Sequence, residues 1–237
     1  MVIQQHIVSA FTEELDQLSA DLLRMGGLAE AMIRDASRAV VKRDAVLAET
    51  VIERDLEMDR LEREVEGKAV RMLALRQPMA SDLRNVIGAI KLAGGIERIG
   101  DLAKNIARRS LKVMDEDNRS ALRGIERMGQ AVSNILQKAL DAYARRDAEA
   151  AIQVLHQDDD IDSHYNGLLR SMLVFMAEEP DQLDARSNFL FIVKNLERIG
   201  DHSTNIAKVV HFIATGERIS AANLNDQRLK NPKEAGS

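Results

Sequence analysis

The chain has 237 residues, enough for one large domain or two of ordinary size. Apolar residues make up 45% of it but aromatic residues only 3%, and only three prolines occur, so the composition favours long helices over sheets. The net charge of −5 argues against a nucleic-acid-binding protein, and the absence of cysteine excludes disulfides and thiolate metal sites, which fits a reducing cytoplasm.

From the N-terminus, the sequence predicts three helices in the first half of the chain. The first residues lack the basic start and continuous apolar stretch of a signal peptide, and no apolar run reaches the roughly 20 residues that span a bilayer. We expect a cytoplasmic chain that meets a membrane only through a partner. The first helix runs to about Lys42, and Asp44 stands at the N-cap of the second. The second helix ends before Pro78, and the third ends near Met114.

The second half of the chain repeats this order. Its first helix runs to about Arg145, and Asp147 stands at the next N-cap. That second helix ends before Pro180, and Gly216 is a C-cap for the last one. The remaining tail, residues 217–237, is polar and non-periodic, so we expect it to be mobile.

The two halves share sequence as well as helix order. IERIGDLAKNIA at residues 96–107 recurs as LERIGDHSTNIA at residues 196–207. Nearer the N-terminus, Met-Gly at 25–26 recurs at 128–129, an offset of 103 residues. Three antiparallel helices with short connections form a bundle. The sequence therefore predicts an all-α fold of two tandem three-helix bundles, six helices in all, over residues 1–113 and 114–216.

Each copy of the repeated motif places acidic residues on one helix face. Residues four apart lie on the same side of a helix, so Glu97, Asp101 and Asn105 form a stripe opposite the apolar side. We expect this stripe to face outward or toward an adjacent helix at the edge of the bundle. The corresponding stripe of the second copy consists of Glu197, Asp201 and Asn205.

A second acidic pair, Asp55 and Asp59, lies on the preceding helix and recurs as Asp158 and Asp162. Because helices two and three of a bundle are antiparallel neighbours, these pairs can bring four carboxylates together in each unit. A single pair of this kind is usually only a solvated helix face. Like charges four residues apart destabilise a helix by about 0.2–0.5 kcal/mol, so four such pairs kept in both copies indicate a bound cation.

Clusters made only of carboxylates suit hard cations such as Mg²⁺, Mn²⁺ or Ca²⁺, or iron in carboxylate-bridged clusters. Zinc fits less well, because there is no cysteine and no histidine within either stripe. His202 adjoins Asp201 but lies beside the stripe, and we interpret it as a surface or interhelix residue.

These motifs resemble those of the PhoU proteins, accessory regulators of phosphate-specific transport. The resemblance covers about residues 5–216 and includes the two ERIGD segments, the paired aspartates and LALRQPMASDLR at residues 73–84. It implies two similar three-helix bundles with acidic motif pairs on the surface, which in some members hold clusters of several metal ions. The expected metals are divalent or trivalent ions of Mg, Mn, Fe or Zn. Residue by residue, it implies one metal site from Asp55, Asp59, Glu97 and Asp101, and a second from Asp158, Asp162, Glu197 and Asp201.

One departure from the family pattern lies before the first ERIGD segment. Gly94 and Gly95 stand where the family usually has charged or polar residues, whereas Lys194 and Asn195 of the second copy conform. Two glycines loosen a helix, so we expect the first site to be weakened or reshaped.

The resemblance also implies a role in signalling without catalysis. The chain is expected to link the ATPase subunit of the phosphate ABC transporter to a membrane sensor histidine kinase. It would restrain the phosphate-starvation response when phosphate is plentiful. Nucleic acid is not an expected partner, and a second copy of the chain, in a homodimer, is a further candidate.

Two alternatives stand beside this interpretation. One is a metal-free helical interaction scaffold whose acidic faces are simply solvated. The other is a carboxylate-bridged di-iron protein, which normally uses Glu-x-x-His with ligands that face the bundle interior. The chain has no Glu-x-x-His, and its acidic stripes lie away from the apolar side, so the di-iron alternative is disfavoured.

Overall fold

In the computed structural model, every regular element of the described part of the chain is a helix, as the sequence predicts. The described backbone covers residues 2–115, 118–178 and 183–219, and within it the side chains of 2–10, 158–160, 175, 178 and 184–186 are not described. The helices are α1 (Val2–Lys42), α2 (Ala45–Arg76), α3 (Ala80–Ser110), α4 (Arg119–Arg145), α5 (Ala148–His156), α6 (Asp158–Glu178) and α7 (Leu183–Thr215).

The predicted caps are confirmed. The Asp44 carboxylate accepts a hydrogen bond from the Leu47 backbone N–H at 2.9 Å, and that of Asp147 accepts one from Ala150 at 2.9 Å. Gly216 has a φ of +82°, the left-handed conformation that favours glycine after the last residue of a helix. These residues fix where α2, α5 and α7 begin or end, and hence the order of helices in both units.

Two boundaries differ from the prediction. α3 ends at Ser110 rather than near Met114, because the next residues form turns with bonds to carbonyls three residues back. The expected second helix of the second unit is divided into α5 and α6 at Gln157. Three aspartates follow there, at 158–160, where the first copy has Asp-Leu-Glu at 55–57. Aspartate is a weak former of helix interiors but favours helix starts, which accounts for the break.

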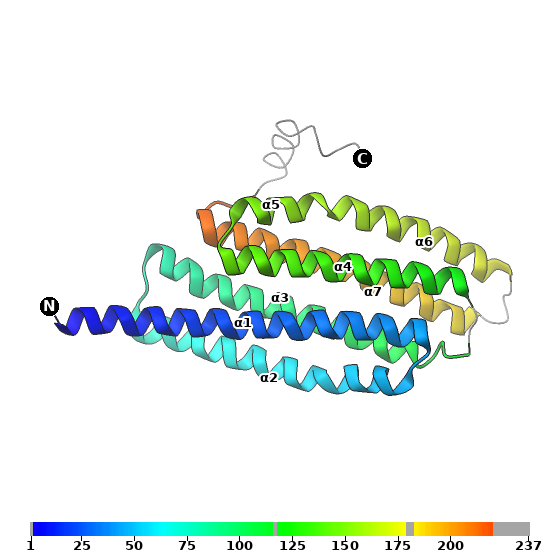
Figure 1. Cartoon of the computed structure of the whole chain (residues 1–237), viewed down its shortest axis with the longest axis horizontal. Helices are drawn as coiled ribbons and strands as arrows, with labels where there is room; N and C mark the ends of the chain where they lie inside the picture. The colour runs from blue at the N-terminus through cyan, green and yellow to red at the C-terminus, as the bar shows by residue number, and fades with distance from the viewer. Residues whose placement is uncertain (1, 116–117, 179–182, 220–237) are drawn as a thin grey trace.

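The two units pack side by side and antiparallel (Figure 1). α1 lies against α4, and α3 lies against α7 in the most extensive contact between any two helices. α2 and the pair α5–α6 form the outer edges, each packed within its own unit. The apolar sides of all these helices meet in one core of aliphatic residues.

Glycines at the unit boundary show that the two units are related by an approximate two-fold axis. Gly26 of α1 lies against the Leu140 side chain of α4, with no room for a Cβ atom. Gly129 of α4 lies in the same way against Ser37 of α1. At the 103-residue offset, positions 26 and 37 correspond to 129 and 140, so these are the same contact made twice. The repeated Met-Gly pair is therefore explained by close packing of α1 on α4.

The described helices include none that is both long and apolar enough to cross a membrane. Of the predicted polar tail, only residues 217–219 are within the described ranges.

Candidate carboxylate clusters

The glycine of each ERIGD segment brings the acidic helix face close to the neighbouring helix. A Cβ atom at Gly100 would lie 3.1 Å from the Met58 side chain of α2, and one at Gly200 would lie 3.0 Å from that of Ile161 of α6. Close packing of α3 on α2, and of α7 on α6, therefore places Asp101 and Asp201 next to the acidic residues of the outer helices.

In the first unit, Asp55 of α2 and Asp101 of α3 meet through a lysine. The Lys104 ammonium lies 2.5 Å from Asp55 Oδ2 and 2.5 Å from Asp101 Oδ1. Asp55 and Lys104 are poorly exposed, because Asp55 as a residue is only 8% exposed and the Lys104 side chain 14%, whereas the Asp101 side chain is 30% exposed. Burial disfavours the ammonium, but its bonds to the two carboxylates outweigh this and raise the pKa of Lys104. The first cluster thus contains its own cation.

Glu97 and Glu62 of this unit lie among further carboxylates. Burial raises the pKa of Glu97, and the nearby Asp101, Glu62 and Asp59 raise it further, against the effect of Arg98. Burial also raises the pKa of Glu62. The Glu62 carboxylate lies close to Gly94, where a Cβ atom would be 3.8 Å from Oε1. The first cluster therefore includes Glu62 beside the four predicted residues.

In the second unit, the lysine of the cluster is Lys194, which precedes the ERIGD segment instead of following it. Lys194 Nζ lies 2.8 Å from Glu197 Oε1 and 5.2 Å from the centroid of the Tyr165 ring. The Glu197 side chain is only 14% exposed, and its other oxygen, Oε2, is buried without a hydrogen-bond partner. The ion pair with Glu197 raises the pKa of Lys194, against the opposing effect of burial.

The aspartates of the second unit are arranged differently from those of the first. Asp162 on α6 and Asp201 on α7 are both exposed, and the side chain of Asp158 is outside the described residues. Position 204 corresponds to Lys104 but is a threonine, whose hydroxyl donates to the Asp201 backbone carbonyl at 2.9 Å. No ammonium group from this position reaches the second cluster.

The two clusters lie on either side of the boundary between the units, where α3 packs against α7. His202 of α7 is half-buried there, and burial together with Arg198 and Arg98 lowers its pKa. The Asp201 carboxylate opposes this shift, so His202 lies near charged groups of both signs, from α3 and from α7. This agrees with the interpretation of His202 as an interhelix residue beside the stripe.

The described side chains contain no group of three or more histidine, aspartate or glutamate residues placed to hold a metal ion. The structure brings Asp55 and Asp101 to a common point, and Asp59 and Glu97 into the same electrostatic neighbourhood. Metal binding at the predicted residues stays a prediction. Lys104 was not among the predicted site residues, although it lies three residues after Asp101 and is replaced by threonine in the other copy.

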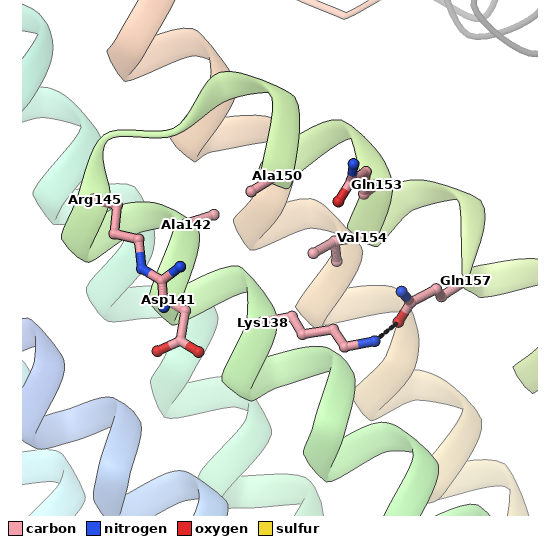
Figure 2. A pocket seen from close by; sticks show the side chains of 8 residues that line it. All are labelled: Lys138, Asp141, Ala142, Arg145, Ala150, Gln153, Val154 and Gln157. Carbon is pink, nitrogen blue, oxygen red and sulfur yellow. Dashed lines mark hydrogen bonds between the residues drawn. The ribbon is translucent and has the colours of Figure 1, made fainter. Parts of the chain in front are cut away.

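A shallow cavity of about 210 Å³ lies between α4 and α5 (Figure 2), and its lining includes Gln157, the residue before the predicted ligand Asp158. Across it, the Lys138 ammonium donates a hydrogen bond to Gln157 Oε1 at 2.9 Å. None of the eight predicted metal ligands lines it. The lining residues are Lys138, Asp141, Ala142, Arg145, Ala150, Gln153, Val154 and Gln157.

The duplicated units can be compared with known proteins. A match to the PhoU domain covers residues 22–110 and, a second time, residues 125–210. The chain belongs to the PhoU family. Each PhoU domain match contains one ERIGD segment and falls within one of the two units.

Similarity to individual PhoU proteins extends over nearly the whole chain. A protein of Caulobacter vibrioides, named phosphate-specific transport system accessory protein PhoU homolog, is 46% identical over 92% of this chain and 95% of its own length. The crystal structure of PhoU from Pseudomonas aeruginosa is similar with a TM-score of 0.84 and 38% identity, over 87% of this chain and all of that one. The phosphate transport system regulatory protein PhoU from Streptococcus pneumoniae has a TM-score of 0.82 and 28% identity, over 89% and 99% of the two chains.

Proposed function

We propose that the chain is a non-enzymatic accessory protein of phosphate-specific transport. The observation that carries this proposal is the PhoU match to both units, together with 46% identity to an accessory protein of that system over 92% of the chain. A fold that consists, in its described part, of packed helices with acidic surface clusters is suited to binding proteins, and the shallow cavity between α4 and α5 is too small to enclose a typical substrate.

Within that role, we propose an adaptor in the cytoplasm. It would contact the ATPase subunit of the phosphate transporter and a sensor histidine kinase, and restrain the starvation response when phosphate is plentiful. The family resemblance supports this finer assignment. The two-fold arrangement supports it too, because the chain has two related outer edges, α2 and α5–α6, and each would contact a different partner.

Metal binding is the second part of the proposal, and the two clusters fit a metal ion unequally. In the second cluster, the buried and unpaired Glu197 Oε2 marks a place for a positive partner. Glu197, Asp201 and Asp162 are not by themselves placed as a ligand group, so an ion there would need Asp158 beside them, as the family pattern implies. When bound, a divalent cation would supply the charge that offsets repulsion between these carboxylates. In the first cluster, Lys104 already stands between Asp55 and Asp101.

The adaptor role is tested by deleting the gene that encodes this chain and measuring a phosphate-starvation reporter in phosphate-rich medium. We expect the reporter to switch on in the deletion strain and to switch off when the wild-type chain is restored. The Gly27→Ala variant is a matched control, because Gly27 is exposed with open space around its Cβ position, and it should restore the wild-type response. A reporter that stays off in the deletion strain would contradict negative regulation.

Physical contact is tested with the tagged full chain in extract from phosphate-replete cells. We expect the transporter ATPase subunit and the sensor kinase to be enriched relative to an untagged control. Recovery of neither would contradict the adaptor role, whatever the outcome of metal measurements.

A further inference from the structure

The two clusters of the chain differ in where a lysine supplies positive charge. In the second unit, Lys194 pairs with Glu197 at 2.8 Å and leaves Asp201 exposed. In the first unit, position 94 is glycine, and the lysine instead lies at position 104, at the aspartate end of the motif. Each copy therefore has one lysine in its cluster, but the two lysines neutralise opposite ends of the acidic stripe.

The Lys104 ammonium occupies the position that a metal ion bridging α2 and α3 would occupy. The ammonium nitrogen is 2.5 Å from an oxygen of Asp55 on α2 and 2.5 Å from one of Asp101 on α3. The ammonium thus donates a charge-assisted hydrogen bond to each carboxylate, the stronger class of hydrogen bond. Because Lys104 is poorly exposed, moving the ammonium away would leave the buried Asp55 carboxylate without a counter-ion.

A divalent ion at the first cluster would have to share these oxygens with the ammonium. The positive charges would repel each other, and each carboxylate oxygen bonded to Lys104 has a lone pair already engaged. The other carboxylates of the first cluster, Asp59, Glu62 and Glu97, are not placed as a ligand group, and neither are the described carboxylates of the second cluster. The two clusters therefore differ in the lysine at position 104 and not in a preformed site.

We propose that Lys104 is a built-in cation that closes the first cluster to divalent metal ions, so that metal binding is confined to the second cluster, where threonine replaces this lysine. The inference rests on the metal-binding part of the proposed function. It assigns different roles to the two clusters: a fixed internal ion pair joins α2 to α3, whereas an exchangeable cation joins α6 to α7.

The test is a titration of chelator-treated full-length protein with Mn²⁺ alone. The paramagnetic signal of the free ion measures how much Mn²⁺ remains unbound. The wild type should bind at the second cluster, and the double variant Glu197→Gln, Asp201→Asn should lose that binding. Lys104→Met, which removes the charge, should gain about one additional Mn²⁺ per chain. Lys104→Arg keeps the charge and should gain none.

Thermal unfolding gives an independent readout. Without metal, Lys104→Met should unfold at a lower temperature than the wild type, because Asp55 loses its counter-ion. Mn²⁺ should recover part of that loss in Lys104→Met but not in Lys104→Arg. If Lys104→Met does not fold, Lys104→Gln keeps an amide donor for the carboxylates and replaces it in both measurements.

The outcomes separate this inference from the proposed function. Wild-type binding with no gain in the uncharged Lys104 variants overturns the inference and leaves metal binding at the second cluster intact. A gain in those variants without wild-type binding supports the closure of the first cluster by Lys104, but it overturns metal binding at the second cluster and with it that part of the proposed function. No binding by any variant overturns both, because removal of the lysine then opens no site.

Discussion

Gly129 of α4 lies directly against Ser37 of α1, and a Cβ atom at position 129 would be 2.8 Å from Ser37 Cβ. Since a Cβ atom is fixed to its backbone, the side chain cannot rotate away, and the two helices would have to separate. This contact lies at the boundary between the units. The free energy of unfolding of a variant at Gly129 therefore reports on the packing of α1 against α4.

We expect Gly129→Ala to be less stable than Gly27→Ala by about 1–3 kcal/mol, the usual cost of overpacking. Both substitutions gain about 1 kcal/mol of helix propensity, but a Cβ atom at Gly27 meets nothing within 4 Å. The difference between the variants in urea unfolding therefore isolates the clash. Equal stabilities of the two alanine variants would show that α1 and α4 are not closely packed here.

Arg109 joins the end of α3 to the start of α7. Its guanidinium donates to the buried Asn188 Oδ1 at 3.0 Å and lies 4.1 Å from the centroid of the Phe191 ring. We expect Arg109→Met to lower the free energy of unfolding by about 1–2 kcal/mol, because a charged hydrogen bond and a cation–π contact are lost. The neighbouring and exposed Arg108 provides the control, since Arg108→Met should change stability little. Similar losses in both variants would point to a general charge effect instead.

Glu30 of α1 gives a pH dependence at the boundary between the units. Burial raises its pKa above the ordinary value of 4.5, Asp141 of α4 raises it further, and Arg34 opposes the shift. A carboxyl whose pKa is raised by folding contributes most to stability below its unfolded pKa, and this contribution is lost as pH rises through the folded pKa. Glu30→Gln should therefore be more stable than the wild type at neutral pH, and the difference should shrink as pH falls toward 4.5.

The matched control for this measurement is Glu126→Gln, an exposed carboxyl on α4. Urea unfolding of the three proteins at pH 7 and near pH 4.5 would compare them directly. A Glu30→Gln advantage that is the same at both pH values would contradict the assigned cause.

The order of helices followed from the sequence because its signals are local. N-caps such as Asp44 and Asp147 act on backbone groups two or three residues away, and the prolines act on their neighbours. The break at Gln157 was missed, since it depends on small propensity differences between Asp-Asp-Asp and Asp-Leu-Glu within an otherwise helical segment.

The candidate site was only partly predictable for a different reason. Helical spacing placed Asp101 and Asp55 on facing sides of neighbouring helices, and the structure confirms that they meet. Spacing does not show which long and flexible side chain fills the space between them. That depends on the register of α2 against α3, which the Gly100–Met58 contact sets.

The approximate two-fold relation between the units has a consequence for assembly. A single ancestral unit that paired with its own copy through helices one and three would form the same surfaces that α1, α3, α4 and α7 now bury within one chain. Such a pair would fall apart on dilution, whereas the covalent link makes the association independent of protein concentration. Gene fusion also allowed the halves to diverge, which no symmetric pair of identical subunits can do.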